Sequence, residues 1–289
     1  MEPLVSVLMT VYNREKYISQ AIESVINSTY QNWELIIVDD RSKDSSVEIA
    51  RKYAGQDSRI KVFVNENNLG DYPNRNQAAS YASGKYIKYV DADDMIYPYG
   101  LEILVQYMEI FPDAGYGLCS LDQDVLEIYP FKLNPSEAYK RHYFSKSLFH
   151  KAPLSAIIRM DAFREVGGFT GKRMLGDFEM WHLLSKKYPV VLMPHGVAWY
   201  RVHDEQEMSL HRADPMEPFK YLLNSIEHLN ASDCPLEKKD REMALIHQNK
   251  KIARSVLSAL KHHSFKKAIE LKKASGLGFF DTIRLGVFK

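Results

Sequence analysis

The segment YIKYVDADDMI, residues 86–96, decides the fold of this chain. It is an apolar run that ends abruptly in Asp91, Asp93 and Asp94, and carboxylates this close repel one another unless something compensates their charge. Mg²⁺ and Mn²⁺ compensate it well, because they prefer oxygen ligands and keep waters or phosphates in their other positions. The segment therefore predicts a buried strand whose polar end either holds a divalent metal or forms a solvated turn that caps the next helix.

Two hydrophobic periods alternate on either side of this segment. Apolar runs of strand length predict strands over 4–10, 33–38, 60–64, 86–90 and 116–119. Apolar residues spaced at three and four predict a helix that Asn13 can cap, and further helices over 47–53, 74–82 and 101–111. This alternation is typical of an α/β fold with a Rossmann-like, mostly parallel sheet flanked by helices. In such open sheets, ligands bind at the carboxyl ends of the strands.

A second acidic segment, IIVDDRSKD at 36–44, also follows a predicted strand. Asp39 or Ser42 can cap the helix that comes next. Asp40 has no capping duty if Ser42 supplies it, so its carboxylate is free to accept a hydrogen bond from a nucleobase N–H.

Two more predicted strands end in MTVYN (9–13) and NENNLGDYPNRNQAA (65–79). Tyr12 offers an aromatic face for a base, and Arg75 offers a cation for a diphosphate. Each residue alone fits a simpler role, Tyr12 as a packed aromatic and Arg75 as a surface cation. The convergence of four polar segments on one edge of the sheet favours a nucleotide site.

The second half of the chain is less regular. Segment 121–153 loses its periodicity and predicts loops and short helices, which either form an irregular surface or bind an acceptor. Helices are expected over 161–166 and 179–188 and beyond residue 218, and short strands over 190–193 and 197–200. The predicted organisation is a domain of residues 1–212, with halves 1–120 (nucleotide) and 121–212 (acceptor), and a helical, basic C-terminal extension, 213–289.

Charge is unevenly distributed along the 289 residues, although the net charge is only +1. Residues 250–289 hold ten Lys or Arg against two acidic residues, a net +8, and the remainder carries −7. The small total gives no drive toward nucleic acid. The basic helices fit either a solvated face or peripheral contact with an anionic membrane that carries a lipid-linked acceptor.

The cysteines and the N-terminus bear on the cellular compartment. Cys119 and Cys234 stand far apart without His or Cys neighbours, which argues against a disulfide framework and a zinc site and favours a reducing compartment. No basic leader precedes the apolar run 4–11, and no apolar stretch reaches the roughly 20 residues of a membrane helix. We expect a cytoplasmic protein, peripheral at the inner face of the membrane if the basic helices bind lipid.

Seven segments, in order and spacing, resemble the family 2 glycosyltransferases with the GT-A fold. They are VSVLMTVYN (5–13), IIVDDRSKD (36–44), NLGDYPNRN (68–76), YVDADD (89–94), VGGF (166–169), GDFEMW (176–181) and YRVHDEQEMS (200–209). The resemblance extends over residues 4–209. The QxxRW signature of the processive, membrane-spanning members is absent, so the resemblance implies transfer of a single sugar.

The resemblance also implies roles for individual residues. Asp91 and Asp93 would bind Mn²⁺ or Mg²⁺ together with the donor diphosphate. Asp177 would be the general base of an inverting transfer and would take the proton of the acceptor hydroxyl on the face opposite the leaving group. The other implied positions are Thr10, Tyr12, Asp40 and Arg75 around the nucleotide, and Arg201 and His203 over the diphosphate.

One position departs from the family pattern. Gly176 stands where the family usually has Glu before the base, which puts the neighbours of Asp177 in doubt more than Asp177 itself. Because Asp177 precedes a predicted helix, it also fits a helix cap.

The implied reaction moves one sugar from a nucleoside-diphosphate donor, a UDP-sugar, to a hydroxyl acceptor in surface polysaccharide or glycoconjugate synthesis. That acceptor would be a saccharide or a lipid-linked saccharide. One alternative is a sugar-phosphate nucleotidyltransferase, which would need a Gly-rich basic loop after the first strand, where MTVYNREKY has no glycine. The other is a non-catalytic nucleotide-sugar-binding homologue, which would have no use for Asp177.

Overall fold

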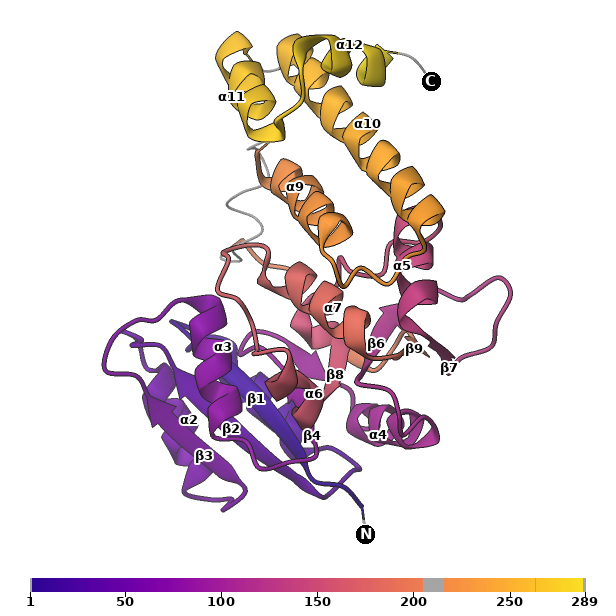
Figure 1. The fold of residues 1–289 in the computed structure, drawn as a ribbon. Coiled ribbons are helices and arrows are strands. Elements are labelled where there is room, and N and C mark those ends of the chain that lie inside the picture. Colours follow the sequence, from indigo (N-terminus) through magenta and orange to yellow (C-terminus); the bar gives the residue numbers. More distant parts are fainter. Residues whose placement is uncertain (1, 205–215, 263, 288–289) are drawn as a thin grey trace. The chain divides into compact units, whose positions relative to one another are not determined.

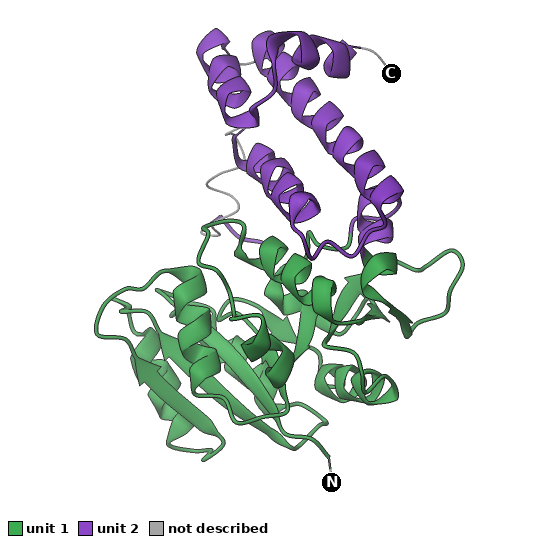
Figure 2. Ribbon diagram, viewed as in Figure 1, with its two compact units in different colours: residues 1–138, 148–201 green, residues 139–147, 202–289 purple. Residues whose placement is uncertain are grey.

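The computed structural model describes residues 2–204, 216–262 and 264–287 (Figure 1). The chain divides into two compact units (Figure 2), which are residues 1–138 with 148–201 (unit 1) and residues 139–147 with 202–289 (unit 2). The domain boundary predicted between residues 212 and 213 lies in segment 205–215, outside the described residues.

Unit 1 is built on an eight-stranded sheet with the order β3-β2-β1-β4-β8-β6-β9-β7. Strands β3, β2, β1 and β4 are parallel, β8 is antiparallel to β4 and β6, β9 is parallel to β6, and β7 is antiparallel to β9. A separate pair joins β5 and β10. The bounds are β1 (Val5–Val11), β2 (Trp33–Asp39), β3 (Ile60–Val64), β4 (Tyr86–Tyr89), β5 (Met95–Ile96), β6 (Tyr116–Leu121), β7 (Phe131–Leu133), β8 (Ala156–Arg159), β9 (Val190–Pro194) and β10 (Ala198–Trp199).

The helices of unit 1 precede or follow these strands in the order that the sequence predicts. They are α1 (Ile18–Ile26), α2 (Ser46–Ala54), α3 (Asp71–Ser80), α4 (Gly100–Ile110), α6 (Met160–Glu165) and α7 (Gly176–Lys187), with a 3₁₀ turn, η1 (Pro153–Ser155). Helix α5 (Pro135–Phe144) has its residues 139–144 in unit 2. The mostly parallel sheet and its helices confirm the predicted fold class.

Burial explains why β1 reads as one continuous apolar run. Val7, Leu8 and Met9 are fully buried although they alternate between the two faces, as expected of a parallel strand covered on both sides. Helix α1 buries Ile18 and Ile22 on one stripe, because residues four apart lie above one another on a helix. The core thereby fixes β1 between β2 and β4, with their carboxyl ends at one edge.

Two details of the predicted helices are wrong. Asn13 does not cap α1, whose N-cap residue is Tyr17; Asn13 has a φ of 52° and its side chain accepts a hydrogen bond from the Lys43 N–H at 2.8 Å. Helix α3 begins at Asp71, three residues before the predicted start, because Pro73 is tolerated in a first turn, where its missing N–H has no partner to lose. This earlier start places three more residues of the polar segment, Asp71, Tyr72 and Pro73, on the helix.

Unit 2 consists of α9 (Met216–Asn230), α10 (Lys238–His262), α11 (Phe265–Ser275) and α12 (Phe279–Val287), together with the end of α5. A small apolar core is formed by Phe219 of α9, Ile252 and Val256 of α10, and Leu271 of α11. The helical C-terminal region agrees with the sequence prediction. None of the helices among the described residues combines the length and the apolar character needed to cross a bilayer.

Candidate active site

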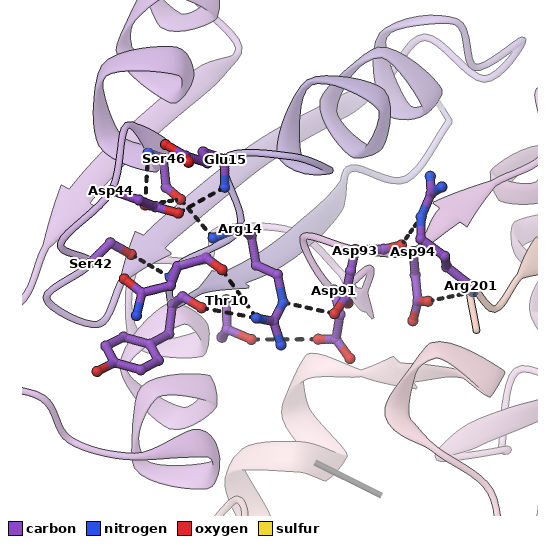
Figure 3. Close-up of polar contacts among 12 residues, drawn as sticks. Thr10, Arg14, Glu15, Ser42, Asp44, Ser46, Asp91, Asp93, Asp94 and Arg201 are labelled. Carbon is purple, nitrogen blue, oxygen red and sulfur yellow. Dashed lines mark hydrogen bonds and ion pairs between the residues drawn. The ribbon is translucent and has the colours of Figure 1, made fainter. Parts of the chain in front are cut away.

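The carboxyl ends of β1, β2 and β4 lie side by side and bring the predicted polar segments together. Val11 is in register with Asp39 of β2, and Leu8 is in register with Tyr89 of β4. Two residues beyond β4, Asp91 accepts a hydrogen bond from the Thr10 hydroxyl at 3.5 Å (Figure 3). The first and fourth predicted segments therefore meet, as the parallel sheet requires.

Arg75 of α3 is the main partner of Asp91. Its Nη1 and Nη2 donate to the two carboxylate oxygens at 2.7 and 3.0 Å, and its Nε donates to Asp71 at 2.8 Å. The side chain is only 7% exposed, so it is not the surface cation that remained an alternative. Burial alone would lower the Arg75 pKa, but Asp71 and Asp91 raise it well above its ordinary value. A fixed cation thus lies against the first aspartate of the acidic turn.

A second arginine holds Asp93. The Nε of Arg14 donates to Asp93 Oδ2 at 2.8 Å, and its Nη1 donates to the carbonyl oxygens of Tyr12 and Asn13 at 3.3 and 3.1 Å. Arg14 lies in the loop after β1, between the aromatic Tyr12 and the start of α1. The loop that carries the predicted base-stacking residue is therefore tied to the acidic turn (Figure 3).

A third arginine, Arg201, is the last residue of unit 1 in the sequence. The backbone N–H of Arg201 donates to Asp94 Oδ1 at 3.0 Å, and its Nε donates to the Asp93 carbonyl at 2.8 Å. Its guanidinium also lies over the rings of Tyr17 and Trp199, with centroids at 5.1 and 4.9 Å. Asp94 therefore holds the chain after β10 to the turn.

Asp94 does not cap the next helix, since the N-cap residue of α4 is Tyr99. Burial and, next, the Asp91 carboxylate raise the pKa of Asp94 to about 8. This shift reflects the crowding of carboxylates that the sequence already indicated.

Asp40 is buried and bonded to the loop before α3. Its carboxylate accepts hydrogen bonds from Asn65 Nδ2 at 2.8 Å and from the backbone N–H groups of Leu69 and Gly70 at 2.7 and 2.8 Å. This network fixes the loop that leads into α3. Tyr12, by contrast, is 44% exposed, so its ring is not packed in the core and has a face open to a base.

Asp177 lies in the first turn of α7 but is not the cap, because the N-cap residue is Leu175. Its Oδ1 accepts a hydrogen bond from the Phe178 N–H at 2.7 Å and one from the Tyr72 hydroxyl at 3.3 Å. Burial raises the pKa of Asp177 to about 6, against the opposing effects of the Phe178 N–H and of Arg75. A carboxyl group with this pKa is ionised at neutral pH yet basic enough to accept a proton.

Helix α3 connects the two parts of the site. Arg75 bonds Asp91, and Tyr72, three residues earlier and so on the same side of the helix, contacts Asp177. The implied base and the acidic turn, far apart in sequence, therefore share one supporting element.

The acidic turn has the chemistry to hold a divalent metal, although no group of three or more His, Cys, Asp or Glu side chains converges anywhere in the part of the chain that the structure describes. Mg²⁺ in nucleotide sites takes one or two carboxylates and completes its shell with waters and substrate phosphates. Asp91 and Asp93 supply such carboxylates, each already facing an arginine. The residues fit a metal that binds together with a diphosphate.

The structure thus brings together most of the predicted site residues. Six of them, Thr10, Tyr12, Asp40, Arg75, Asp91 and Asp93, lie at one edge of the sheet, with Arg201 beside Asp93 and with Asp177 bonded to Tyr72 of α3. His203 belongs to unit 2, and its assignment to the diphosphate stays a prediction. Residues 205–209 of its motif lie outside the described residues.

Arg14 and Tyr72 are site residues that the sequence reasoning missed. Arg14 was detectable, because it is a cation in the same segment as Tyr12. Tyr72 was not, because its role depends on the early start of α3 and on a partner more than 100 positions away in sequence.

Known proteins share this architecture. The model of the family described as glycosyl transferase family 2 matches residues 6–167, more than half of the chain. Over 105 residues the chain is 42% identical to the UDP-Glc:alpha-D-GlcNAc-diphosphoundecaprenol beta-1,3-glucosyltransferase WfgD of Escherichia coli, a match that covers 36% of this chain and 41% of WfgD.

Two solved structures share the fold. The S. aureus TarS 1–349 complex with UDP-GlcNAc has a TM-score of 0.74 and 19% identity and covers 94% of this chain and 80% of TarS 1–349. The mannosyltransferase PcManGT from Pyrobaculum calidifontis, in complex with GDP-Man and Mn²⁺, has a TM-score of 0.66 and 17% identity and covers 95% and 80%. The chain therefore belongs to glycosyl transferase family 2 and adopts its GT-A fold.

Proposed function

We propose that this chain is a metal-dependent, inverting glycosyltransferase that moves a single sugar from a UDP-sugar to a hydroxyl acceptor. The observation that carries the proposal is the joint placement of the acidic turn and Asp177 along one side of α3, with Arg75 and Tyr72 as the links. A nucleotidyltransferase or a non-catalytic binding protein has no need of a carboxyl group with a pKa near 6 beside the turn.

The donor would bind along the carboxyl edge of β1, β2 and β4. The exposed ring of Tyr12 would stack on the base, with Thr10 beside it and the remaining lone pairs of the Asp40 carboxylate facing the base N–H. Arg75 and Arg201 would lie near the diphosphate, as bidentate guanidinium groups suit phosphate oxygens.

Asp91 and Asp93 would hold Mn²⁺ or Mg²⁺ with the donor diphosphate, and the bound metal would stabilise the negative charge of the departing UDP. The arginines that pair with these carboxylates, Arg14 and Arg75, would then also interact with the phosphates. The structure of PcManGT holds both GDP-Man and Mn²⁺, which supports this pairing.

Asp177 would take the proton from the acceptor hydroxyl. The acceptor oxygen bonds to the anomeric carbon while the bond from that carbon to the diphosphate oxygen breaks, and the hydroxyl proton passes to Asp177. One displacement on the opposite face inverts the anomeric configuration. General-base assistance of this kind contributes about 10²- to 10⁴-fold to the rate.

The names of similar proteins support the donor and the acceptor class. WfgD takes UDP-Glc and a diphosphoundecaprenol-linked acceptor, and TarS was crystallised with UDP-GlcNAc. We therefore place UDP-sugars first among the donors, with a saccharide or lipid-linked saccharide as acceptor in polysaccharide or glycoconjugate synthesis. The first 120 residues would bind the donor, and residues 121–212 would face the acceptor.

The C-terminal helices would bring the enzyme to the inner face of an anionic membrane. Helix α12 exposes Phe280, Ile283 and Val287 at 85, 38 and 62%, and their spacing of three and four places them on one stripe. Helix α11 adds lysines, two of them in its last turn, that suit anionic headgroups. This surface fits the interfacial binding that a lipid-linked acceptor requires.

A thermal-shift panel tests the proposed function. UDP-glucose, UDP-GlcNAc, GDP-mannose and a dTDP-sugar are each added to the full chain with Mn²⁺ and with EDTA. We expect a UDP-sugar to raise the thermal midpoint only when Mn²⁺ is present, because a ligand that binds the folded state alone stabilises that state. Indifference to every nucleotide under both conditions would refute the proposal.

A further inference from the structure

The first turn of α3 carries an aromatic side chain that the proposed reaction has not yet used. Tyr72 is 7% exposed, and its ring packs against Phe169 with centroids 5.3 Å apart. Phe169 in turn packs on Tyr89 at 5.6 Å. The side-chain amide of Asn76 holds the backbone of Phe169 from both sides, accepting from its N–H at 2.9 Å and donating to its carbonyl at 2.8 Å. The Tyr72 ring therefore has little freedom to move.

The Tyr72 hydroxyl reaches the carboxylate of Asp177. It donates to Oδ1 at 3.3 Å, and the Phe178 N–H donates to the same oxygen at 2.7 Å. Within the described residues, no donor is bonded to Oδ2. Both contacts therefore hold one oxygen and leave the other available for a proton from the acceptor.

Gly176 explains how Tyr72 fits beside the base. A Cβ at position 176 would lie 2.7 Å from three carbons of the Tyr72 ring, a distance that requires the ring to move. Because the Tyr72 ring packs against Phe169, moving it would cost packing energy. The ring of Tyr72 thus occupies the space that a side chain before the base would need, and glycine at 176 is the condition for it.

We propose that Tyr72 is the positioning residue of the general base, holding Asp177 through its hydroxyl while its ring takes the place of a side chain at 176. The inference rests on the proposed role of Asp177. The groups that face Asp177 are the Tyr72 hydroxyl, Arg75 and Asp71 on α3, and the Phe178 N–H on its own helix. Tyr72 is the only one of these side chains within hydrogen-bond distance of the carboxylate.

The first test is an NMR titration of the side-chain carboxyl carbons of the full chain, with Asp177→Asn to assign the resonance by its loss. We expect a wild-type midpoint of about 6, the value to which burial raises the Asp177 pKa. In Tyr72→Phe it should rise by about half a pH unit, because a hydrogen bond that stabilises the carboxylate is lost. Tyr81→Phe is the matched control; within the described part of the chain, its hydroxyl is bonded only to the Gln77 side chain. An equal midpoint in wild type and Tyr72→Phe would overturn the proposal.

The second test is the rate of UDP release from UDP-GlcNAc or UDP-glucose with Mn²⁺. We expect Tyr72→Phe to lower kcat about tenfold without a matching change in KM for the donor. The acid limb of the pH profile should shift to higher pH. If Asp177→Asn is inactive and Tyr72→Phe matches wild type, the positioning role of Tyr72 is refuted while the general-base role of Asp177 is supported. If Asp177→Asn keeps full activity, the proposed base itself fails.

The third test addresses the packing at position 176. Gly176→Ala should lower the thermal midpoint, and the double variant Tyr72→Ala/Gly176→Ala should be more stable than the sum of the two single changes predicts, because residues in contact are not additive. Additive effects would show that the ring does not exclude a side chain at 176.

Discussion

Two opposing effects set the pKa of the Asp177 carboxyl group. Its burial raises the pKa to about 6, whereas the Phe178 N–H and Arg75 favour the ionised form. The balance gives a group that is deprotonated above pH 6 and accepts a proton readily. The proposed proton transfer therefore depends on this one carboxylate.

We expect Asp177→Asn to reduce UDP release by about 10²- to 10⁴-fold, because an amide cannot accept the proton. In the wild type, kcat/KM should rise with pH up to about 6 and then level off, since only the carboxylate is active. Asp161→Asn, in the first turn of α6 and exposed, is the matched control. A rate that does not change between pH 5 and 8 would contradict the assignment.

The sequence leaves two roles open for Arg75, a surface cation or a cation of the site. Because Arg75 is buried, it is not a surface cation. Arg75→Met would remove the guanidinium that pairs with both Asp91 and Asp71. We expect the free energy of unfolding in urea to fall by about 3 kcal/mol, as for other pairs broken on one side. Arg51→Met, an exposed position on α2, should stay within about 0.5 kcal/mol of wild type. Equal losses in the two variants would show that the Arg75 contacts do not stabilise the turn.

At the scale of elements, sequence predicts the parallel half of the sheet much better than the rest. β3, β2, β1 and β4 follow from continuous apolar runs and from local helix spacing, which need no knowledge of distant partners. β8 was missed because it is a four-residue strand, inserted antiparallel between β4 and β6, and its pairing is set by partners that no local pattern reveals. Helix α5 lies in segment 121–153, for which loops and short helices were expected, but its bounds could not be predicted because its apolar residues follow no clear stripe.

The amino ends of β1 and β2 are joined by a buried glutamate that the site does not use. Glu34 of β2 accepts hydrogen bonds from Ser6 of β1 at 2.7 Å, from the N–H and hydroxyl of Ser83 at 2.8 and 2.7 Å, and from Lys61 of β3 at 2.8 Å. Burial alone would raise its pKa, but these bonds lower it to about 2. The carboxylate therefore ties three strands and the loop after α3 at the end of the sheet opposite the active site.

A group whose pKa is lowered on folding stabilises the protein above its unfolded pKa and loses that effect as the pH falls. We expect the Glu34 contribution to be complete above about pH 4.5 and to vanish as the pH approaches 2. Since one pKa unit corresponds to 1.36 kcal/mol, the contribution is about 3 kcal/mol. Urea unfolding of wild type and Glu34→Gln from pH 2.5 to 7 measures it; parallel curves would contradict the account.

At the scale of the whole molecule, the contrast between the C-terminal charge of +8 and the remainder at −7 was visible in the sequence. The apolar stripe on α12 was not, because which residues α12 exposes depends on how it packs against α10. The edge of the sheet that we propose for the donor was predictable from strand order. The segments that we propose for the acceptor were not, since they lack a regular period.

The membrane proposal is tested by vesicle flotation. We expect the full chain to float with phosphatidylcholine vesicles that contain about 30 mol% phosphatidylglycerol, and less so at high salt, because surface electrostatics are screened. Phe280→Ser/Ile283→Ser should reduce flotation severalfold. Val125→Ser/Leu126→Ser removes apolar residues that are 82 and 87% exposed in unit 1 and is the matched control. Equal flotation of the two double variants would contradict a membrane role for α12.

The most direct test of the central claim is calorimetric titration of UDP into wild type and Asp93→Asn, each with Mn²⁺ and with EDTA. We predict that Mn²⁺ strengthens UDP binding to the wild type at least about tenfold, roughly 1.4 kcal/mol, and that Asp93→Asn removes most of this gain. Asp122→Asn, an exposed aspartate of unit 1, should retain the gain. Equal UDP affinity with Mn²⁺ and with EDTA in the wild type would contradict a metal-dependent nucleotide site at the acidic turn.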